Sequence, residues 1–172
     1  MVEYVFNDLF DQEADYLMEQ KNCFHIHGGL SGIMAQRYPK AAAADLRTPK
    51  GDLNKLGTCQ IVDCGDVKVI NAYAQFSVGG RATDYDAWER ILAGLREYFD
   101  SIPQSLSSRV TTIKCPARLG SGLGGGDFSV MHDIFEKHFG DSKKIIILFC
   151  VRGEDRDWFD EFRKIKKVKI IQ

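Results

Sequence analysis

Short runs of apolar and β-branched residues recur along the chain and predict the strands of a sheet. They cover 2–6, 14–22, 58–65, 67–76, 110–117 and 144–151. Most of them are apolar at successive positions, which is typical of strands that are buried on both faces. Gly65 and Asp66 separate two of the runs and predict a hairpin between them. The pattern therefore predicts a central sheet with helices on both sides.

Apolar residues at three- and four-residue spacing predict helices between these strands. The widest apolar stripe lies in 84–102, with Thr83, Asp84 and Asp86 as cap and first-turn residues. Further helices are expected at 32–38, 40–46, 128–139 and 154–165, and the lysine-rich end 166–172 reads as an edge strand. We therefore expect a single α/β domain over 1–172, with three α/β/α layers and a mixed central sheet.

Glycine occupies positions 120, 122, 124, 125 and 126, between the strand 110–117 and the helix 128–139. A glycine loop that opens onto a helix N-terminus exposes backbone N–H groups, and these suit an anion such as phosphate. The loop is not a P-loop, because no Gly-Lys-Ser/Thr follows. By itself it fits a phosphate site or a structural turn equally well.

A second glycine loop has the same setting. In "NCFHIHGGLSGIMAQRYP" (22–39) a strand ends, Gly28, Gly29 and Gly32 follow, and a helix begins. Ligands of α/β sheets bind beyond the carboxyl ends of the strands, so two such loops can face each other across one crevice. The pair predicts a site for a diphosphate.

Charge and cysteine spacing limit the kinds of partner and site that we expect. The 172 residues carry a formal net charge of −1, which favours neither nucleic acid nor a membrane surface as a partner. The lysine-rich end lacks interleaved aromatic residues and predicts a solvated edge. The five cysteines are scattered without a CxxC pair and are interpreted as reduced thiols, so we expect no disulfide and no metal site. No secretory signal or spanning apolar run is recognised, and a soluble, cytoplasmic protein is expected.

Five motifs in order resemble a macro domain over residues 1 to about 150. They are "NDLF" (7–10), "NCFHIHGGLSGI" (22–33), "VINAYAQF" (69–76), "RATDYDA" (81–87) and "LGSGLGGGDF" (119–128). The branch that they resemble most includes phage-encoded ADP-ribose 1''-phosphate phosphatases. The resemblance implies the macro domain fold and a small-molecule ligand, ADP-ribose or its 1''-phosphate, with no cofactor and ADP-ribosylated protein as a further partner.

The resemblance also implies roles for single residues. Asp8 matches the aspartate that binds the adenine amino group, with the Leu9 backbone beside it, and Asn22 matches the asparagine at the distal ribose. The glycine loops would wrap the diphosphate and the distal ribose, and Phe149 is our guess for stacking on adenine. The remaining ligand-binding residues that it implies are Gly28, Gly29, Ser31, Gly32, Ile33, Gln75, Ser121, Gly122, Leu123, Gly124 and Gly125.

Three departures from related families bear on the chemistry. Gly29 and Leu30 look inserted in the first loop. Met34 stands where the MacroD-type hydrolases resemble one another in having an aspartate. Gln75 and Gly124 stand where another group of hydrolases has a lysine and an aspartate. These absences argue against de-ADP-ribosylation by those two routes and leave phosphate release open.

Candidate catalytic residues have a structural alternative in each case. His25 or His27 would orient the attacking water, because imidazole titrates near neutral pH, or both would only shape the loop. Asp127 would act as a base or only as the N-cap of the helix that follows. Cys23 is interpreted as a buried thiol rather than a nucleophile. His132 and His138 are expected to face solvent.

The resemblance therefore implies an enzyme, a phosphoric monoester hydrolase that converts ADP-ribose 1''-phosphate into ADP-ribose and phosphate. Asn22 would position the distal ribose, and backbone amides would stabilise the phosphate. Two alternatives stay open: a non-catalytic module that binds ADP-ribose, and a hydrolase of ADP-ribosyl or O-acetyl-ADP-ribose with another base. A monomer is expected, in the host cytoplasm if the chain is virally encoded.

Overall fold

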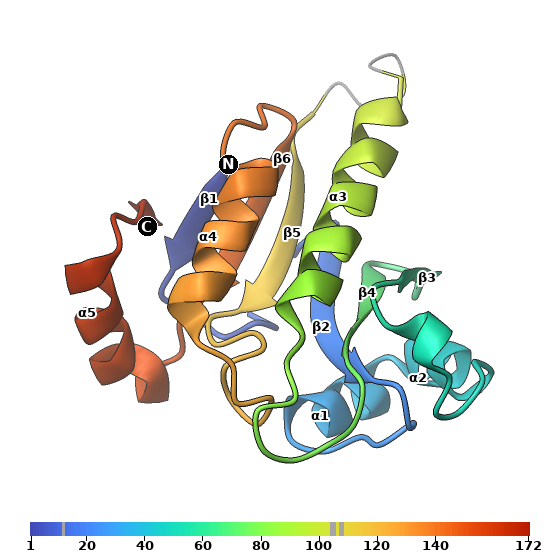
Figure 1. The fold of residues 1–172 in the computed structure, drawn as a ribbon. Coiled ribbons are helices and arrows are strands. Elements are labelled where there is room, and N and C mark those ends of the chain that lie inside the picture. The colour runs from blue at the N-terminus through green and yellow to red at the C-terminus, as the bar shows by residue number, and fades with distance from the viewer. Residues whose placement is uncertain (12, 104–105, 107–108) are drawn as a thin grey trace.

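The computed structural model describes residues 1–11, 13–103, 106 and 109–172. Seven strands form one sheet in the order β3-β4-β2-β5-β6-β1-β7 (Figure 1). The β3–β4 pair is antiparallel, and the other neighbouring strands run parallel to each other. The strands are β1 (Val2–Val5), β2 (Tyr16–Asn22), β3 (Cys59–Asp63), β4 (Lys68–Gln75), β5 (Thr111–Pro116), β6 (Ile145–Cys150) and β7 (Ile170–Ile171).

Helices cover both faces of this sheet, so the predicted three-layer α/β/α architecture with a mixed sheet is confirmed. Helices α3 and α4 lie side by side on one face, and α1 and α2 pack against β2, β3 and β4 (Figure 1). The helices are α1 (Leu30–Arg37), α2 (Pro39–Leu46), α3 (Tyr85–Ser101), α4 (Phe128–Phe139) and α5 (Arg156–Ile165), with short 3₁₀ turns η1 (Leu53–Lys55) and η2 (Gly153–Asp155).

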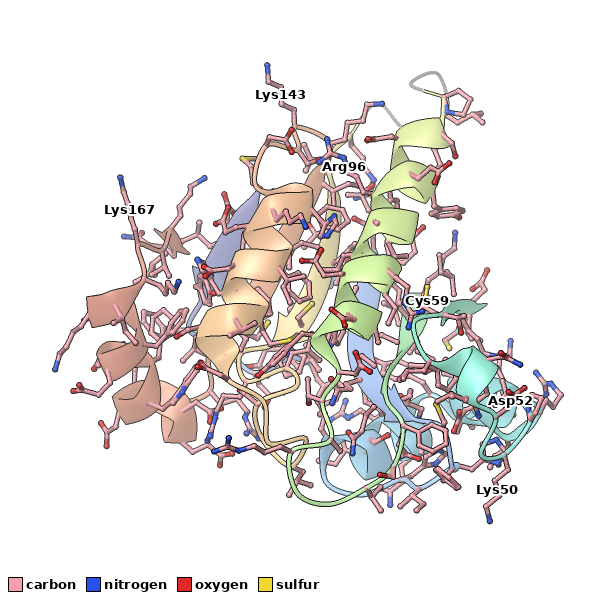
Figure 2. All side chains as sticks on the ribbon, in the orientation of Figure 1. Lys50, Asp52, Cys59, Arg96, Lys143 and Lys167 are labelled. Carbon is pink, nitrogen blue, oxygen red and sulfur yellow. The ribbon has the colours of Figure 1, made fainter. Side chains whose placement is uncertain are left out.

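Each face of the sheet buries its own apolar layer, as the two-sided apolar strands predict. The larger layer lies under α3, α4 and α5 and contains Trp88 and Phe135. The smaller one contains Leu17, Met34 and Val69 and lies under α1 and α2. Side chains fill the space between the helices and the sheet (Figure 2). The predicted hairpin at Gly65 and Asp66 is confirmed, because β3 pairs with β4 in register from Cys59 to Asp63.

The lysine-rich end of the chain forms the edge strand β7, as expected. Lys166 pairs with Asp133, Lys169 with Glu3, and Lys167 points into solvent (Figure 2). Much of this positive charge is therefore balanced by acidic neighbours. No helix in the described part of the chain is long and apolar enough to cross a bilayer.

The expectation that His132 faces solvent is wrong. Its ring is buried on the inner face of α4, where Nδ1 and the Tyr4 hydroxyl share a hydrogen bond of 2.7 Å. The prediction failed because histidine is a polar residue, so the hydrophobic pattern of the helix did not assign this position to the buried face. His138 is half-buried, and its Nε2 lies 2.5 Å from the Glu89 carboxylate.

Candidate functional site

The carboxyl ends of four adjacent parallel strands, β2, β5, β6 and β1, share one edge of the sheet, and a cavity of about 700 Å³ opens there. The two glycine loops, 23–29 after β2 and 117–127 after β5, both border this cavity. Both glycine segments therefore contribute to one crevice, as the sequence predicted.

Most of the residues that the sequence pointed to for ligand binding line this cavity. Those that line it are Asp8, Leu9, Asn22, Gly28, Gly29, Ser31, Ile33, Gln75, Gly122, Leu123 and Gly124. Gly32 of α1 and Ser121 and Gly125 of the second loop lie outside the lining. Asp8 and Leu9 follow β1, and Asn22 ends β2, so they approach the cavity from different strands.

Asn22 fixes the shape of the first loop. Its Oδ1 accepts from the N–H groups of Phe24 and Ile26, and its Nδ2 donates to the Ile26 carbonyl over 2.7 Å. Within the same turn His25 adopts a φ of 60°, the only non-glycine residue of the described chain in the left-handed region. The Asn22 carboxamide therefore holds the first loop in shape at the wall of the cavity.

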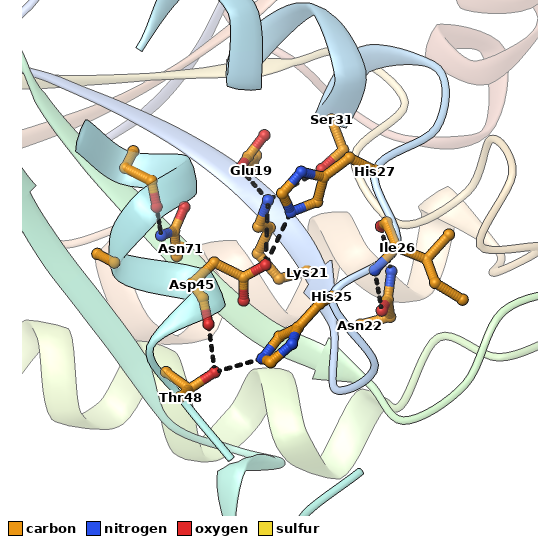
Figure 3. Close-up of polar contacts among 12 residues, drawn as sticks. Glu19, Lys21, Asn22, His25, Ile26, His27, Ser31, Asp45, Thr48 and Asn71 are labelled. Atoms are coloured by element: carbon orange, nitrogen blue, oxygen red, sulfur yellow. Dashed lines mark hydrogen bonds and ion pairs between the residues drawn. The ribbon is translucent and has the colours of Figure 1, made fainter. Parts of the chain in front are cut away.

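Neither loop histidine lines the cavity, which favours the alternative that both shape the loop over the one in which His25 or His27 orients the attacking water. His27 Nε2 donates to Asp45 Oδ2 over 2.8 Å, and His25 Nε2 lies 3.2 Å from Thr48 Oγ1 (Figure 3). Only Ile26, between them, lines the cavity. The partners of the two rings lie on α2 and just beyond it, and neither partner lines the cavity.

Asp127 is the N-cap of α4, where its Oδ1 accepts from the Ser129 N–H over 2.8 Å. It does not line the cavity, so the structure favours the capping role over the role of a base. Cys23 is fully buried, and burial raises its pKa, as expected for a structural thiol. All five cysteines are free, and the described residues contain no cluster of three or more potential metal ligands.

Close packing requires glycine at positions 124 and 125 of the second loop. A Cβ on Gly124 would overlap Thr83 Oγ1 and lie 2.7 Å from Gln20 Nε2, and one on Gly125 would overlap the Gly80 carbonyl. The loop packs against the side chains of Gln20 and Thr83. Gln20 Nε2 donates to Thr83 Oγ1, and Thr83 Oγ1 donates to the Gly120 carbonyl. Gly124 and Gly125, which helped to suggest a phosphate site, are therefore also explained by close packing.

The guess that Phe149 stacks on adenine is wrong. Phe149 is fully buried in the core, stacked on Tyr4 at 5.2 Å between ring centroids and edge-on to Phe128 and Phe135. Its position near the end of β6 was right, but its side chain points into the layer under α4.

Several lining residues were missed by the sequence reasoning. Phe10 lines the cavity, with the Arg37 guanidinium 4.2 Å from the centre of its ring. Arg118 follows β5, and Arg152 follows β6 and pairs with Glu154 and Asp155. Arg118 and Arg152 stand just after a strand, the one signal that could have identified them. Glu19 and Gln20, inside β2, carry no such signal.

Comparison with solved structures identifies the architecture. The macrodomain of Mycobacterium tuberculosis DarG matches with a TM-score of 0.70 at 20% sequence identity, over 87% of this chain and 97% of the other. This chain has a macrodomain fold. An Oceanobacillus iheyensis macrodomain mutant with ADP-ribose matches at 0.66 and 12% identity, over 95% of this chain and 92% of the other.

Thermosipho africanus DarTG in complex with ADP-ribose matches this macrodomain fold at a TM-score of 0.65 and 14% identity, over 84% of this chain and 40% of the other. No protein-family model and no curated protein sequence matches the chain. The likeness is therefore one of structure, and it covers most of this chain.

Proposed function

We propose that this macrodomain fold binds ADP-ribose. The observation that carries the proposal is the cavity at the carboxyl edge of the sheet, which both glycine loops border and which Asp8 and Asn22 line from β1 and β2. Structural neighbours include complexes with ADP-ribose. The diphosphate would lie between the loops and accept from backbone N–H groups there, other than those of Gly122, Gly125 and Gly126, which donate to carbonyls of the second loop.

Asp8 is the residue proposed to select adenine. Its Oδ1 accepts from the Phe10 N–H over 3.0 Å, which holds the carboxylate at the wall of the cavity. A carboxylate accepts a hydrogen bond from the amino group of adenine but not from the carbonyl of hypoxanthine. Phe10, beside it, offers an aromatic side chain for the base.

Calorimetry with ADP-ribose and with its inosine analogue tests this proposal. The native chain should bind ADP-ribose more tightly, and Asp8→Ala should remove the difference between the two ligands. Asp66→Ala is the control, because this aspartate lies in the β3–β4 hairpin outside the cavity. Absence of heat with ADP-ribose at millimolar concentration would refute the proposal.

Hydrolysis of ADP-ribose 1''-phosphate is the second candidate. Two amide-rich loops at the distal end favour it, since they suit a terminal phosphate as well as a diphosphate. The imidazoles of His25 and His27, however, bond to Thr48 and Asp45, and the Asn22 carboxamide is engaged in its loop. The geometry therefore supports binding better than catalysis. Phosphate release by the protein that binds ADP-ribose, in amounts above a Gly124→Ala variant, would establish the reaction.

A further inference from the structure

Lys21 is a buried cation directly beneath the first loop. It lies near the end of β2 with 2% of its side chain exposed and does not itself line the cavity. Its ammonium group donates to Ser31 Oγ over 3.1 Å, contacts Glu19 Oε1 at 2.9 Å and lies 3.9 Å from Asp45 Oδ2 (Figure 3). A lysine this deep costs free energy of desolvation, so its three polar neighbours are needed to hold it.

Ser31 connects this cation to the cavity. It is the second residue of α1 and lines the cavity, whereas Lys21 lies behind it. Its hydroxyl oxygen accepts from the Lys21 ammonium, and no described residue accepts its proton. A hydroxyl that accepts from a cation is polarised and becomes a better donor to an anion on its open side.

Glu19 limits how much positive charge this arrangement carries. Its Oε1 pairs with Lys21, while Oε2 is buried without a hydrogen-bond partner among the described residues. Burial raises the pKa of this carboxyl, opposed by Lys21. Asp45 is compensated separately, by hydrogen bonds from Tyr73 and His27. Glu19 is therefore the carboxylate that most directly offsets the positive charge of Lys21.

We propose that Lys21 acts through Ser31 as a buried cation for the diphosphate of the ligand, and that Glu19 weakens this attraction. Lys21 and Glu19 are positioning residues, and Ser31 is the group that contacts the anion. This inference rests on the proposed binding of ADP-ribose and adds to it the residues that hold the charged centre of that ligand.

Single and double variants of Lys21 and Ser31 test whether the lysine acts through the serine. ADP-ribose serves as the charged ligand and adenosine as the uncharged one. Lys21→Met should weaken ADP-ribose binding about tenfold to a hundredfold and leave adenosine nearly unchanged. Ser31→Ala should weaken it about tenfold, and Ser31→Thr, which keeps the hydroxyl, should stay within about threefold. In the Ser31→Ala background Lys21→Met should add little, because its path to the ligand is gone.

Glu19→Gln provides the matched control, because it disrupts the same ion pair from the opposite side. Both Lys21→Met and Glu19→Gln should lower the melting temperature, but Glu19→Gln should tighten ADP-ribose binding about threefold at pH 8. A purely structural role would weaken binding in both variants, and that result, or additive effects of Lys21→Met and Ser31→Ala, would overturn the inference. If the native chain itself fails to bind ADP-ribose, the proposed function fails instead.

Discussion

His27 Nε2 donates to Asp45 Oδ2 over 2.8 Å, and this contact ties the first glycine loop to α2. Asp45 is almost fully buried and also accepts from the Tyr73 hydroxyl over 2.7 Å. Burial opposes the ionisation of Asp45, yet the hydrogen bonds from Tyr73 and His27 outweigh it and lower its pKa. The imidazole therefore anchors the loop through an ionised carboxylate, and neither group lines the cavity.

His27→Ala should loosen this loop rather than remove a catalytic group. We expect ADP-ribose affinity to fall by about threefold to tenfold, because one hydrogen bond to a charged group is lost. Calorimetry measures this change. If phosphate release from ADP-ribose 1''-phosphate is found, its pH profile should stay the same in His27→Ala. Loss of that activity with unchanged affinity would show instead that His27 acts in the chemistry.

The architecture could be predicted from the sequence because each element carried its own signal. Helix α3 has a full stripe of apolar residues with Asp84 as cap, β6 is apolar at every position, and β4 is apolar at five of its eight positions. A parallel sheet then places the carboxyl ends of β2 and β5 at the same edge, so the shared crevice follows from topology alone.

The directions of single side chains could not be predicted in the same way. Loop 23–29 has no periodicity, and the turn at His25 depends on three hydrogen bonds of Asn22. Lys21 pairs with Glu19 inside β2 and finds its further partners on α1 and α2, outside its own strand. Only the assembled fold shows why two opposite charges occupy a buried strand.

Gly124→Ala should displace the second loop. The added methyl group would overlap Thr83 Oγ1 and crowd Gln20, which is already held by Trp88 Nε1 over 2.8 Å. We expect a loss of about 1–3 kcal/mol in the free energy of unfolding, measured by denaturant titration, and weaker ADP-ribose binding. Gly122→Ala is the control in the same loop, because its Cβ would meet nothing within 4 Å. Equal loss of stability in both variants would contradict this account of the glycines.

Phe149 and Phe10 should separate stability from binding. Phe149→Leu leaves a gap among Tyr4, Phe128 and Phe135 and should cost about 1–3 kcal/mol of stability with little effect on ADP-ribose affinity. Phe10→Leu removes an aromatic ring from the wall of the cavity and should weaken ADP-ribose binding more than it lowers stability. Thermal unfolding and calorimetry on both variants measure these two effects. Loss of affinity in Phe149→Leu, with loss of stability alone in Phe10→Leu, would place the base beside β6.

The stability of the fold should decrease as the pH falls below neutral, partly because of His132. Burial lowers the pKa of this histidine below 6.5, so its proton binds more readily in the unfolded chain. Its contribution is present above pH 6.5 and is lost as the pH falls from there through its lowered pKa, with a slope of at most about 1.4 kcal/mol per pH unit. His132→Gln should flatten this part of the curve. Denaturant titrations from pH 8 to pH 5 measure this slope. At pH 8 the two chains differ only in packing and in the hydrogen bond to Tyr4. Parallel curves for the native chain and His132→Gln would show that the buried imidazole does not titrate with unfolding.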